Sequence, residues 1–378
     1  MAKLILKNGE EFEGVTFGYE GSVGGEVVFA TGMTGYPEAL TDPSFAGQIL
    51  ILTYPLIGNY GVPKKKFWES GKLQISGLIV SDYIDTPSHH QSKMTLSEWL
   101  KKEKIPALEI KDTRYITQYL RENGTMLGKI INGKDTPFFD PNVLNIVEQV
   151  SIKKILKEKP EGLNKHKRVI IIDCGAKNNI KRCFLKRGVE TITVPWDFDP
   201  FSNEGQKQLK NVIANEVKQS LSIKIAASPL APRDDNLFDA LFISNGPGDP
   251  KKADKTIEVI KKSLENKIPT LGICLGNQLL ALAAGGDTYK LKYGHRSQNQ
   301  PCIMEKSNRC FITTQNHGFA ISDVPVGFDK WFTNANDDSI EGIIHSKLPF
   351  MSVQFHPEAT PGPKDTEWIF DFFLEKLT

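Results

Sequence analysis

Hydrophobic positions follow two different patterns along this chain, with the change near residue 150. Before it, short apolar segments are separated by Gly, Pro and Thr turns, which is typical of a domain that mixes strands and helices. After it, continuous apolar runs such as 169–172 alternate with amphipathic segments such as 254–265. Such runs are typical of strands buried on both faces of a parallel sheet, and the amphipathic segments are typical of covering helices. The pattern predicts the α/β class: an N-terminal mixed α+β domain at 1–150 and a C-terminal doubly wound, mostly parallel sheet at 168–378.

Individual elements follow from the same periodicities and from turn residues. In the first domain the predicted strands are 4–6, 27–30, 48–54 and 78–80, and the predicted helices are 97–101 and 113–123. In the second domain the predicted strands are 169–172, 190–194, 240–244, 270–274 and 351–355, and the predicted helices include 178–187 and 254–265.

Two polar segments interrupt these patterns. Residues 151–167 are dense in Lys, Glu and Pro, and we expect a solvated helix and linker between the domains there. Residues 203–236 separate two strands that far fewer residues could join. Apolar positions between Leu209 and Val217 allow a helix, but the segment carries no recognisable chemistry, so we expect a surface insertion.

Composition restricts the class of protein and its partners. The chain has 378 residues, of which 39% are hydrophobic and 24% charged, as in ordinary soluble proteins with two domains. Lys and Arg number 47 against 45 Asp and Glu, so we expect no surface for nucleic acid. No apolar run approaches the roughly 20 residues that cross a bilayer, and residues 1–9 lack the apolar core of a signal peptide. Five cysteines without a CxxC pair favour a reducing cytoplasm over a disulfide framework.

The sharpest chemical signal is a cysteine between a strand and a helix. Cys274 follows the apolar run 270–273, and Gly272 and Gly276 flank it two residues away on either side. This layout is typical of a nucleophile elbow, a strained turn that exposes a reactive side chain. A helix N-terminus lowers the pKa of a thiol and leaves backbone N–H groups, including that of Leu275, free to hold an oxyanion. The alternative is a small buried hydrophobic residue, which is our interpretation of the other four cysteines.

A candidate base follows a later strand. His356 comes after the apolar run 351–355, and Glu358 lies two residues further on, on the same side of an extended chain stiffened by Pro357. Glu358 is therefore placed to hold the imidazole that His356 presents to Cys274, and the order Cys, His, acid is a known variant of the catalytic triad. A histidine at a strand end beside a solvated carboxylate is the alternative until Cys274 is considered with it.

Further loops carry weaker signals. Gly246 and Gly248 flank a proline after the strand 240–244, and their N–H groups could face a negative oxygen, although a simple turn is an equal alternative. His317, in the sequence QNHGF, is a candidate substrate contact with the same alternative. No phosphate-binding P-loop or GxGxxG motif occurs, so any ATP is expected to bind another protein. The two adjacent histidines at 89–90 have no further potential ligands nearby at the spacing of a metal site, and we expect no metal site.

Taken together, these motifs resemble the class I, triad-type glutamine amidotransferases. GICLG at 272–276, the loop at 245–250 and HPE at 356–358 occur in that family's order and spacing. The rest of the chain resembles the small subunit of carbamoyl-phosphate synthase, in the segments 31–38, 41–45, 52–61, 110–114 and 293–296. Asn277, where family members often carry His, and the segment 297–301 depart from the pattern, and neither departure touches the triad.

The resemblance implies a mechanism and a partner. Cys274 would attack the side-chain carbonyl of glutamine, His356 would transfer protons, and Glu358 would orient His356. Ammonia would pass to a large subunit that binds ATP and Mg²⁺ and makes carbamoyl phosphate from bicarbonate, for arginine and pyrimidine synthesis, and this chain would hold no cofactor. The implied glutamine site comprises Ser44, Gly246, Gly248, Leu275, Gln278, Asn316, Gly318 and Phe319.

Two other hypotheses are weighed against this one. An amidotransferase that acts alone or serves another synthase is disfavoured by the N-terminal half, which such enzymes are not expected to carry. A non-catalytic, glutamine-binding regulatory subunit is disfavoured because Cys274, His356 and Glu358 are all present.

Overall fold

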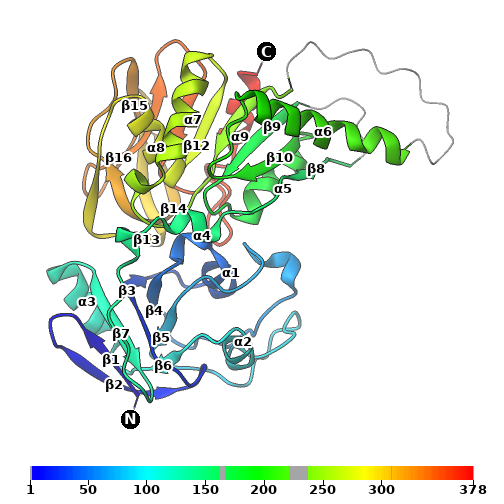
Figure 1. Ribbon diagram of the computed structural model, residues 1–378. Coiled ribbons are helices and arrows are strands. Elements are labelled where there is room, and N and C mark those ends of the chain that lie inside the picture. Colours follow the sequence, from blue (N-terminus) through cyan, green and yellow to red (C-terminus); the bar gives the residue numbers. More distant parts are fainter. Residues whose placement is uncertain (1, 162–166, 221–236, 308, 378) are drawn as a thin grey trace.

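The computed structural model describes residues 2–161, 167–220, 237–307 and 309–377, and it has two parts that pack against each other (Figure 1). In the N-terminal part, strands in the order β1-β2-β6-β5-β4-β3-β7 form a closed barrel. The strands are β1 Ala2–Leu6, β2 Glu11–Thr16, β3 Val23–Ala30, β4 Gln48–Leu52, β5 Gly77–Val80, β6 Ala107–Glu109 and β7 Met126–Ile131. The helices are α1 Tyr36–Thr41, α2 Leu96–Lys102, α3 Thr113–Asn123 and α4 Ile146–Val150.

This half mixes strands and helices, as the sequence predicts. Its barrel combines parallel and antiparallel strand pairs. β3, β4, β5 and β6 pair in parallel, while β1, β2 and β7 join antiparallel. Alternate side chains along β4 divide between two cores: Leu50 packs in the cluster with Trp99 of α2, and Ile49 in the cluster with Leu120 of α3. The predicted strands and helices of this half are confirmed, but β2, β6 and β7 and the closure of the barrel were not predicted.

In the C-terminal part, an open sheet has the order β14-β13-β15-β16-β17-β12-β11-β9-β10-β8. Its centre, from β17 to β10, is parallel. The strands are β8 Leu156–Glu158, β9 Arg168–Asp173, β10 Glu190–Pro195, β11 Ala240–Ile243, β12 Thr270–Ile273, β13 Thr288–Met304, β14 Arg309–Ile321, β15 Phe328–Asn334, β16 Ile340–His345 and β17 Phe350–Val353. The helices are α5 Asn178–Lys186, α6 Asn203–Ser220, α7 Asp254–Glu265, α8 Leu275–Ala283 and α9 Trp368–Glu375.

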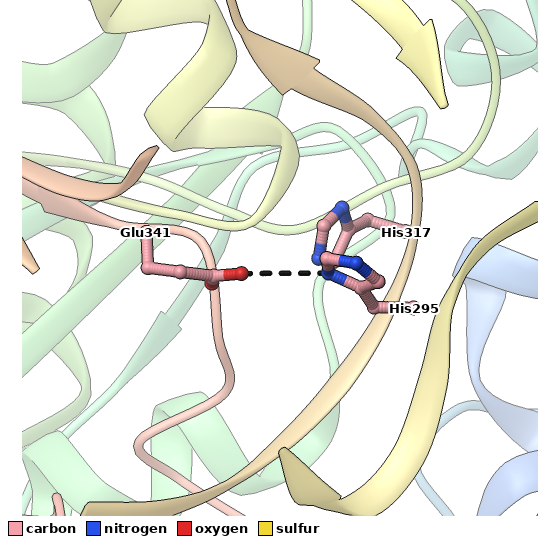
Figure 2. A group of neighbouring side chains, drawn as sticks. All are labelled: His295, His317 and Glu341. Atoms are coloured by element: carbon pink, nitrogen blue, oxygen red, sulfur yellow. Dashed lines mark ion pairs between the residues drawn. The ribbon is translucent and has the colours of Figure 1, made fainter. Parts of the chain in front are cut away.

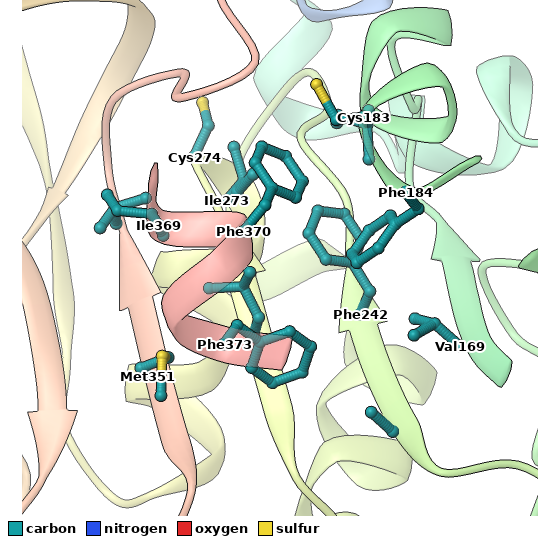
Figure 3. Close-up of a cluster of buried hydrophobic side chains, with 14 of the residues drawn as sticks. Val169, Cys183, Phe184, Phe242, Ile273, Cys274, Met351, Ile369, Phe370 and Phe373 are labelled. Carbon is teal, nitrogen blue, oxygen red and sulfur yellow. The ribbon is translucent and has the colours of Figure 1, made fainter. Parts of the chain in front are cut away.

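Helices cover both faces of the parallel centre, which confirms the doubly wound prediction. Along β9, Val169 faces the core that contains α5 and α9, whereas Ile170 faces the core that contains α6, α7 and α8. On the first face, the ring of Phe184 lies edge-on to Phe242 and to Phe370, with centroids 5.2 Å apart in both pairs (Figure 3). Such aromatic pairs contribute roughly 0.5–1.5 kcal/mol each beyond the area that they bury.

Three features of this half differ from the sequence predictions. The solvated helix expected within 151–167 is wrong, because Leu156–Glu158 pairs antiparallel with β10 at the sheet edge; residues 162–166 lie outside the described residues. The surface insertion expected at 203–236 is wrong for the start of α6, since Leu209 is fully buried in a core cluster; residues 221–236 also lie outside the described residues. In the sheet, β9 lies between β10 and β11, so the chain must cross over β9 to connect these two parallel strands. Helix α6 is part of that crossover. The long antiparallel extension from β16 to β14 adds to the predicted parallel sheet.

The two parts contact each other close to the carboxyl ends of the parallel strands. Glu69 of the barrel domain is fully buried, forms an ion pair with Arg182 at 2.9 Å, and accepts a hydrogen bond from the backbone N–H of Asn179. Thr34 accepts a hydrogen bond from Gln298 on β13. In the part of the chain that the structure describes, we find no helix with the length and apolarity that a bilayer crossing requires.

Candidate active site

The predicted residues come together because four neighbouring parallel strands end at one edge. β9, β11, β12 and β17 are adjacent in the sheet, and Lys177, Gly246, Cys274 and His356 follow their carboxyl ends. In open α/β sheets this edge is where ligands bind.

Cys274 occupies a strained turn between β12 and α8. Its φ is +56° and its ψ is −105°, a region that residues with a side chain rarely adopt. A Cβ atom added to Gly272 would overlap the backbone of Gly276, and one added to Gly276 would overlap the backbone oxygen of Ile243. The turn therefore needs both glycines, as a nucleophile elbow does. The backbone N–H of Cys274 donates to Val353 on β17 at 2.8 Å, which ties the elbow to the strand that leads to the histidine.

His356 and Glu358 form a buried pair. His356 Nδ1 lies 2.7 Å from Glu358 Oε1, and the two residues are 1% and 2% exposed. Because Nδ1 faces a carboxylate, it carries the proton, while Nε2 has no hydrogen-bond partner among the described residues. Burial lowers the pKa of His356, but Glu358 and Cys274 together outweigh it and raise the pKa to about 10. The pocket thus stabilises the imidazolium that forms when a thiol proton moves to His356.

A buried lysine completes this arrangement. Lys177 Nζ lies 3.0 Å from Glu358 Oε1 and also donates to the backbone oxygen of Ala359. Burial raises the pKa of Glu358, but Lys177 and His356 outweigh it and bring the pKa down to about 2. Sequence analysis missed Lys177; its position directly after the buried strand β9 was the available signal.

The residues assigned to glutamine binding line one pocket. Cys274 forms part of its wall. The pocket is lined by all eight predicted residues: Ser44, Gly246, Gly248, Leu275, Gln278, Asn316, Gly318 and Phe319. Glu26, Gln48, Asn142, Arg296 and His317 also line it; of these, only His317 was suggested by its sequence context.

Comparison with known proteins fits this geometry. Residues 170–376 match the family described as "Glutamine amidotransferase class-I", and residues 4–130 match "Carbamoyl-phosphate synthase small chain, CPSase domain". The chain belongs to the class-I glutamine amidotransferases. In this amidotransferase the family match covers the open sheet, and the small-chain match covers the barrel.

Curated relatives resemble the amidotransferase over nearly its whole length. It is 44% identical to "Multifunctional protein URA2" of Saccharomyces cerevisiae and 46% identical to "Multifunctional protein CAD" of Squalus acanthias, over 100% and 99% of the chain. It is 40% identical, over 100% of the chain, to "Carbamoyl-phosphate synthase [ammonia], mitochondrial" of Homo sapiens. The chain spans only 18%, 16% and 24% of the length of these three proteins.

Both domains of the amidotransferase build the pocket beside Cys274. Asp42 in the barrel domain accepts a hydrogen bond from Asn316 Nδ2 at 3.0 Å and a second from Asn245 Nδ2 at 3.3 Å. Asn245 also donates to Ser44 Oγ at 2.9 Å. The hydrogen bonds fix the loop after β11 and the strand β14 relative to the barrel, so a change in domain packing would change the pocket.

Residues next to the elbow form hydrogen bonds that hold the wall of the amidotransferase pocket. Gln278 Nε2 donates to the backbone oxygen of Phe319 at 2.8 Å and to Gln354 Oε1 at 3.1 Å. Asn277 is fully buried and bonds Gln354 and Ser352, away from the pocket. Asn277, where the chain departs from the family pattern, therefore bonds side chains that follow or belong to β17.

The other four cysteines and the histidine pair at 89–90 lie outside the pocket of the amidotransferase. Cys174, Cys183 and Cys302 are buried among core side chains, and burial raises the pKa of Cys183 to about 12. Cys310 is exposed on β14. The pair at 89–90 is exposed on a loop of the barrel domain.

Proposed function

We propose that this chain hydrolyses glutamine to glutamate and ammonia through a thioester on Cys274, and delivers the ammonia to an ATP-dependent synthase that makes carbamoyl phosphate from bicarbonate. The observation that carries the proposal is the juxtaposition of Cys274, in its strained elbow, with the buried pair of His356 and Glu358. Glu358 and Cys274 both act on His356 and raise its pKa. The synthase partner would bind ATP and Mg²⁺. The partner is either a separate chain or a domain fused to this one. The curated relatives are much longer than this chain, so their remaining length has room for such a domain.

The chemistry would proceed in two halves. The Cys274 sulfur attacks the side-chain carbonyl carbon of glutamine, while the thiol proton passes to His356 Nε2. The resulting oxyanion is held by the N–H of Leu275, at the start of α8, and by an N–H of the loop at 246–248. His356 then protonates the leaving amide nitrogen, ammonia departs, and a thioester remains. Water attacks the thioester, gives its proton to His356, and releases glutamate and the thiol.

A second pocket supports delivery of ammonia. Its lining includes His356, Asn316, Lys177, Met33 and Pro361. Asn316 and Arg296 line both this pocket and the glutamine pocket, so the two spaces adjoin. Met33 also lines a surface groove with Arg121, Lys292 and Tyr293. A small neutral molecule released beside His356 would have space to move toward that groove, where we propose that the synthase docks.

The alternative function is a regulatory subunit that binds glutamine without hydrolysing it. One relative at 40% identity is named for ammonia, so overall likeness alone does not decide whether glutamine is used. The side chains at the elbow do favour hydrolysis, because a binding subunit needs neither the strained Cys274 nor an orphaned Nε2 on His356.

The experiment that tests the proposal mixes the purified chain with its candidate synthase partner and measures carbamoyl phosphate from glutamine, ATP and bicarbonate. Cys274→Ser should abolish the use of glutamine and leave synthesis from added ammonia intact. Ammonia release without carbamoyl phosphate would keep the hydrolysis and reject the partner. Neither product from the wild-type chain would favour the regulatory hypothesis.

A further inference from the structure

A second buried polar cluster lies beside the glutamine pocket. His295, His317 and Glu341 bring three potential metal ligands within 4.8 Å of one another (Figure 2). Each of these groups already has a protein partner: His295 Nε2 lies 2.9 Å from Asp337, His317 Nδ1 lies 2.8 Å from the Phe319 oxygen, and Glu341 accepts from Asn334 and Gln315. The cluster is therefore a hydrogen-bonded network, and its chemistry lies in how it holds charge.

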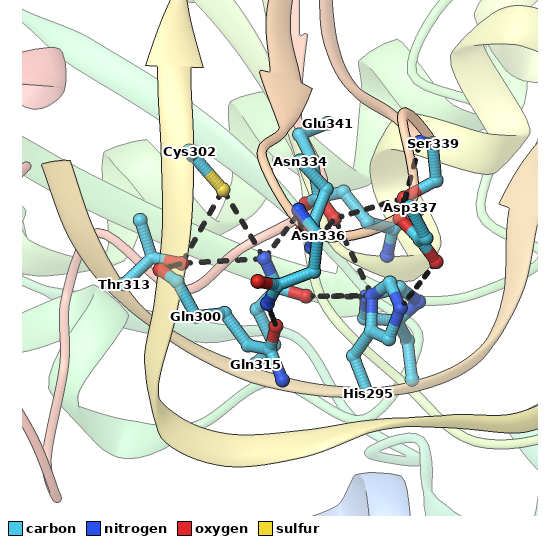
Figure 4. Close-up of polar contacts among 12 residues, drawn as sticks. His295, Gln300, Cys302, Thr313, Gln315, Asn334, Asn336, Asp337, Ser339 and Glu341 are labelled. Atoms are coloured by element: carbon cyan, nitrogen blue, oxygen red, sulfur yellow. Dashed lines mark hydrogen bonds and ion pairs between the residues drawn. The ribbon is translucent and has the colours of Figure 1, made fainter. Parts of the chain in front are cut away.

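The network holds a histidine between two carboxylates. His295 Nε2 faces Asp337 and Nδ1 lies 3.4 Å from Glu341, whose side chain is fully buried (Figure 4). Burial lowers the pKa of His295, but Asp337 and Glu341 outweigh it and raise the pKa to about 9. Other titratable groups also face the cluster. They are His317, whose pKa is held well below its usual range by burial and then by His295, Tyr289, and Cys302, whose sulfur accepts a hydrogen bond from Gln315. At neutral pH the network thus holds one imidazolium between two carboxylates.

The charge orients one glutamine. Gln315 Oε1 lies 3.0 Å from His295 Nδ1, and Gln315 Nε2 donates to Glu341 Oε2 at 2.9 Å (Figure 4). The opposite orientation of the amide would set its oxygen against the Glu341 carboxylate and its NH₂ against the cationic ring. Both of these contacts would be repulsive, so the imidazolium and the carboxylate favour the observed orientation over the flipped one.

From Gln315 the network reaches the wall of the pocket. Gln315 Oε1 also lies 3.0 Å from His317 Nε2, and His317 Nδ1 lies 2.8 Å from the backbone oxygen of Phe319. The neutral ring of His317 carries one proton, so it donates to only one of these two oxygens. That same oxygen accepts the hydrogen bond from Gln278. Between these anchors lie Asn316, whose backbone oxygen is 3.6 Å from the Cys274 sulfur, and Gly318.

We propose that His295 is a positioning residue for glutamine binding: its imidazolium, held by Asp337 and Glu341, orients Gln315 and through it fixes the 315–319 segment that forms one wall of the pocket. The inference rests on the proposed function for the identity of the ligand. His295 is absent from the lining of the glutamine pocket, so its effect on glutamine passes through Gln315 and His317.

The direct test is glutamine binding by calorimetry in a Cys274→Ser background, where no hydrolysis can occur. His295→Asn should raise the Kd for glutamine about tenfold or more, as expected for loss of a charge-assisted hydrogen bond that holds the wall. In the active chain the same change should raise KM and leave kcat within about threefold, since the triad is untouched. An unchanged Kd would overturn the inference. Because binding is measured separately, a wild-type chain that releases no ammonia would reject the proposed function without deciding this point.

A second variant covers the case in which His295→Asn does not fold. Asp337→Asn, at a half-exposed position, removes one carboxylate and so lowers the pKa of His295. The pH above which the Kd for glutamine rises should move downward from about 9, whereas Asp338→Asn, an exposed neighbour, should leave it in place. The amino group of free glutamine also titrates in alkaline solution and affects every variant equally. The test is therefore the difference between the variants in the pH at which the Kd rises. Identical profiles for Asp337→Asn and Asp338→Asn would overturn the inference.

Discussion

Oε1 of Glu358 is shared between two partners: His356 Nδ1 lies 2.7 Å from it, and Lys177 Nζ lies 3.0 Å from it. All three side chains are buried, so this oxygen sits between two cationic groups in a medium that screens charge poorly. Lys177 therefore keeps Glu358 ionised, and Glu358 in turn keeps His356 in the orientation that presents Nε2 toward Cys274.

Lys177→Met tests this order of dependence. Without the ammonium group, the buried carboxylate of Glu358 loses its nearest fixed cation, and its pKa rises. We expect kcat for glutamine hydrolysis to fall roughly 10²-fold, and stability to fall by about 3–5 kcal/mol, as when one partner of a buried ion pair is removed. Steady-state ammonia release and urea unfolding would measure the two effects. Lys186→Met, at an exposed position of the helix α5 that follows Lys177, serves as the control; equal losses in both variants would contradict the assignment.

The buried pair also predicts how stability varies with pH. Glu358 has a depressed pKa, so its contribution is present above about 4.5 and is lost as the pH falls toward 2. His356 has a raised pKa, so its contribution is complete below 6.5 and is lost as the pH rises through 10. The difference in Tm between wild type and Glu358→Gln should therefore be greatest between these limits and shrink on both sides. Thermal unfolding across the pH range measures it, and Glu375→Gln, at an exposed position, should show no such maximum.

The elbow predicts a steric requirement at Gly276. A methyl group there meets the backbone oxygen of Ile243, which cannot move aside as a side chain can. Gly276→Ala should cost roughly 1–3 kcal/mol of stability or more and displace Cys274 from His356, with loss of most hydrolysis. In Gly71→Ala the nearest atom to the added carbon is the end of Lys65, 3.9 Å away, so that variant should behave as wild type. A fully active Gly276→Ala chain would contradict the strained-turn account.

The shared pocket predicts that the barrel domain affects affinity. Asp42→Ala removes an acceptor that Asn316 and Asn245 share; Asn316 loses its bond to Asp42, while Asn245 keeps its bond to Ser44 Oγ. We expect the KM for glutamine to rise about tenfold with kcat within about threefold, because the triad keeps its own contacts. Asp85→Ala, at an exposed site of the same domain, is the control for general effects of losing a charge. A fall in kcat alone, with KM unchanged, would show that Asp42 acts elsewhere.

Local patterns in the sequence were sufficient for the elbow and the parallel strands. Cys274 lies between an apolar run and a helix, and two glycines mark the turn, so short-range information defines it. His356 and Glu358 are two residues apart, and their contact also follows from local geometry. The parallel strands were visible because both of their faces are buried, which leaves continuous apolar runs.

Long-range pairing explains what sequence analysis missed. Closure of the barrel depends on β1 meeting β7, more than 100 residues later, and no local pattern specifies that partner. β8 is a three-residue edge strand with a polar sequence, so its pairing with β10 gave no periodic signal. Lys177 and His295 differ from surface cations only through contacts with Glu358 and Asp337, which the fold brings to them.

Trapping the acyl-enzyme tests the central claim most directly. The chain would be mixed with glutamine, quenched in acid within a turnover, digested, and analysed by mass spectrometry. The account predicts a glutamyl adduct on the peptide that contains Cys274, and no such adduct in Cys274→Ser. Ammonia release by Cys274→Ser at the wild-type rate, or an adduct on another cysteine, would contradict it.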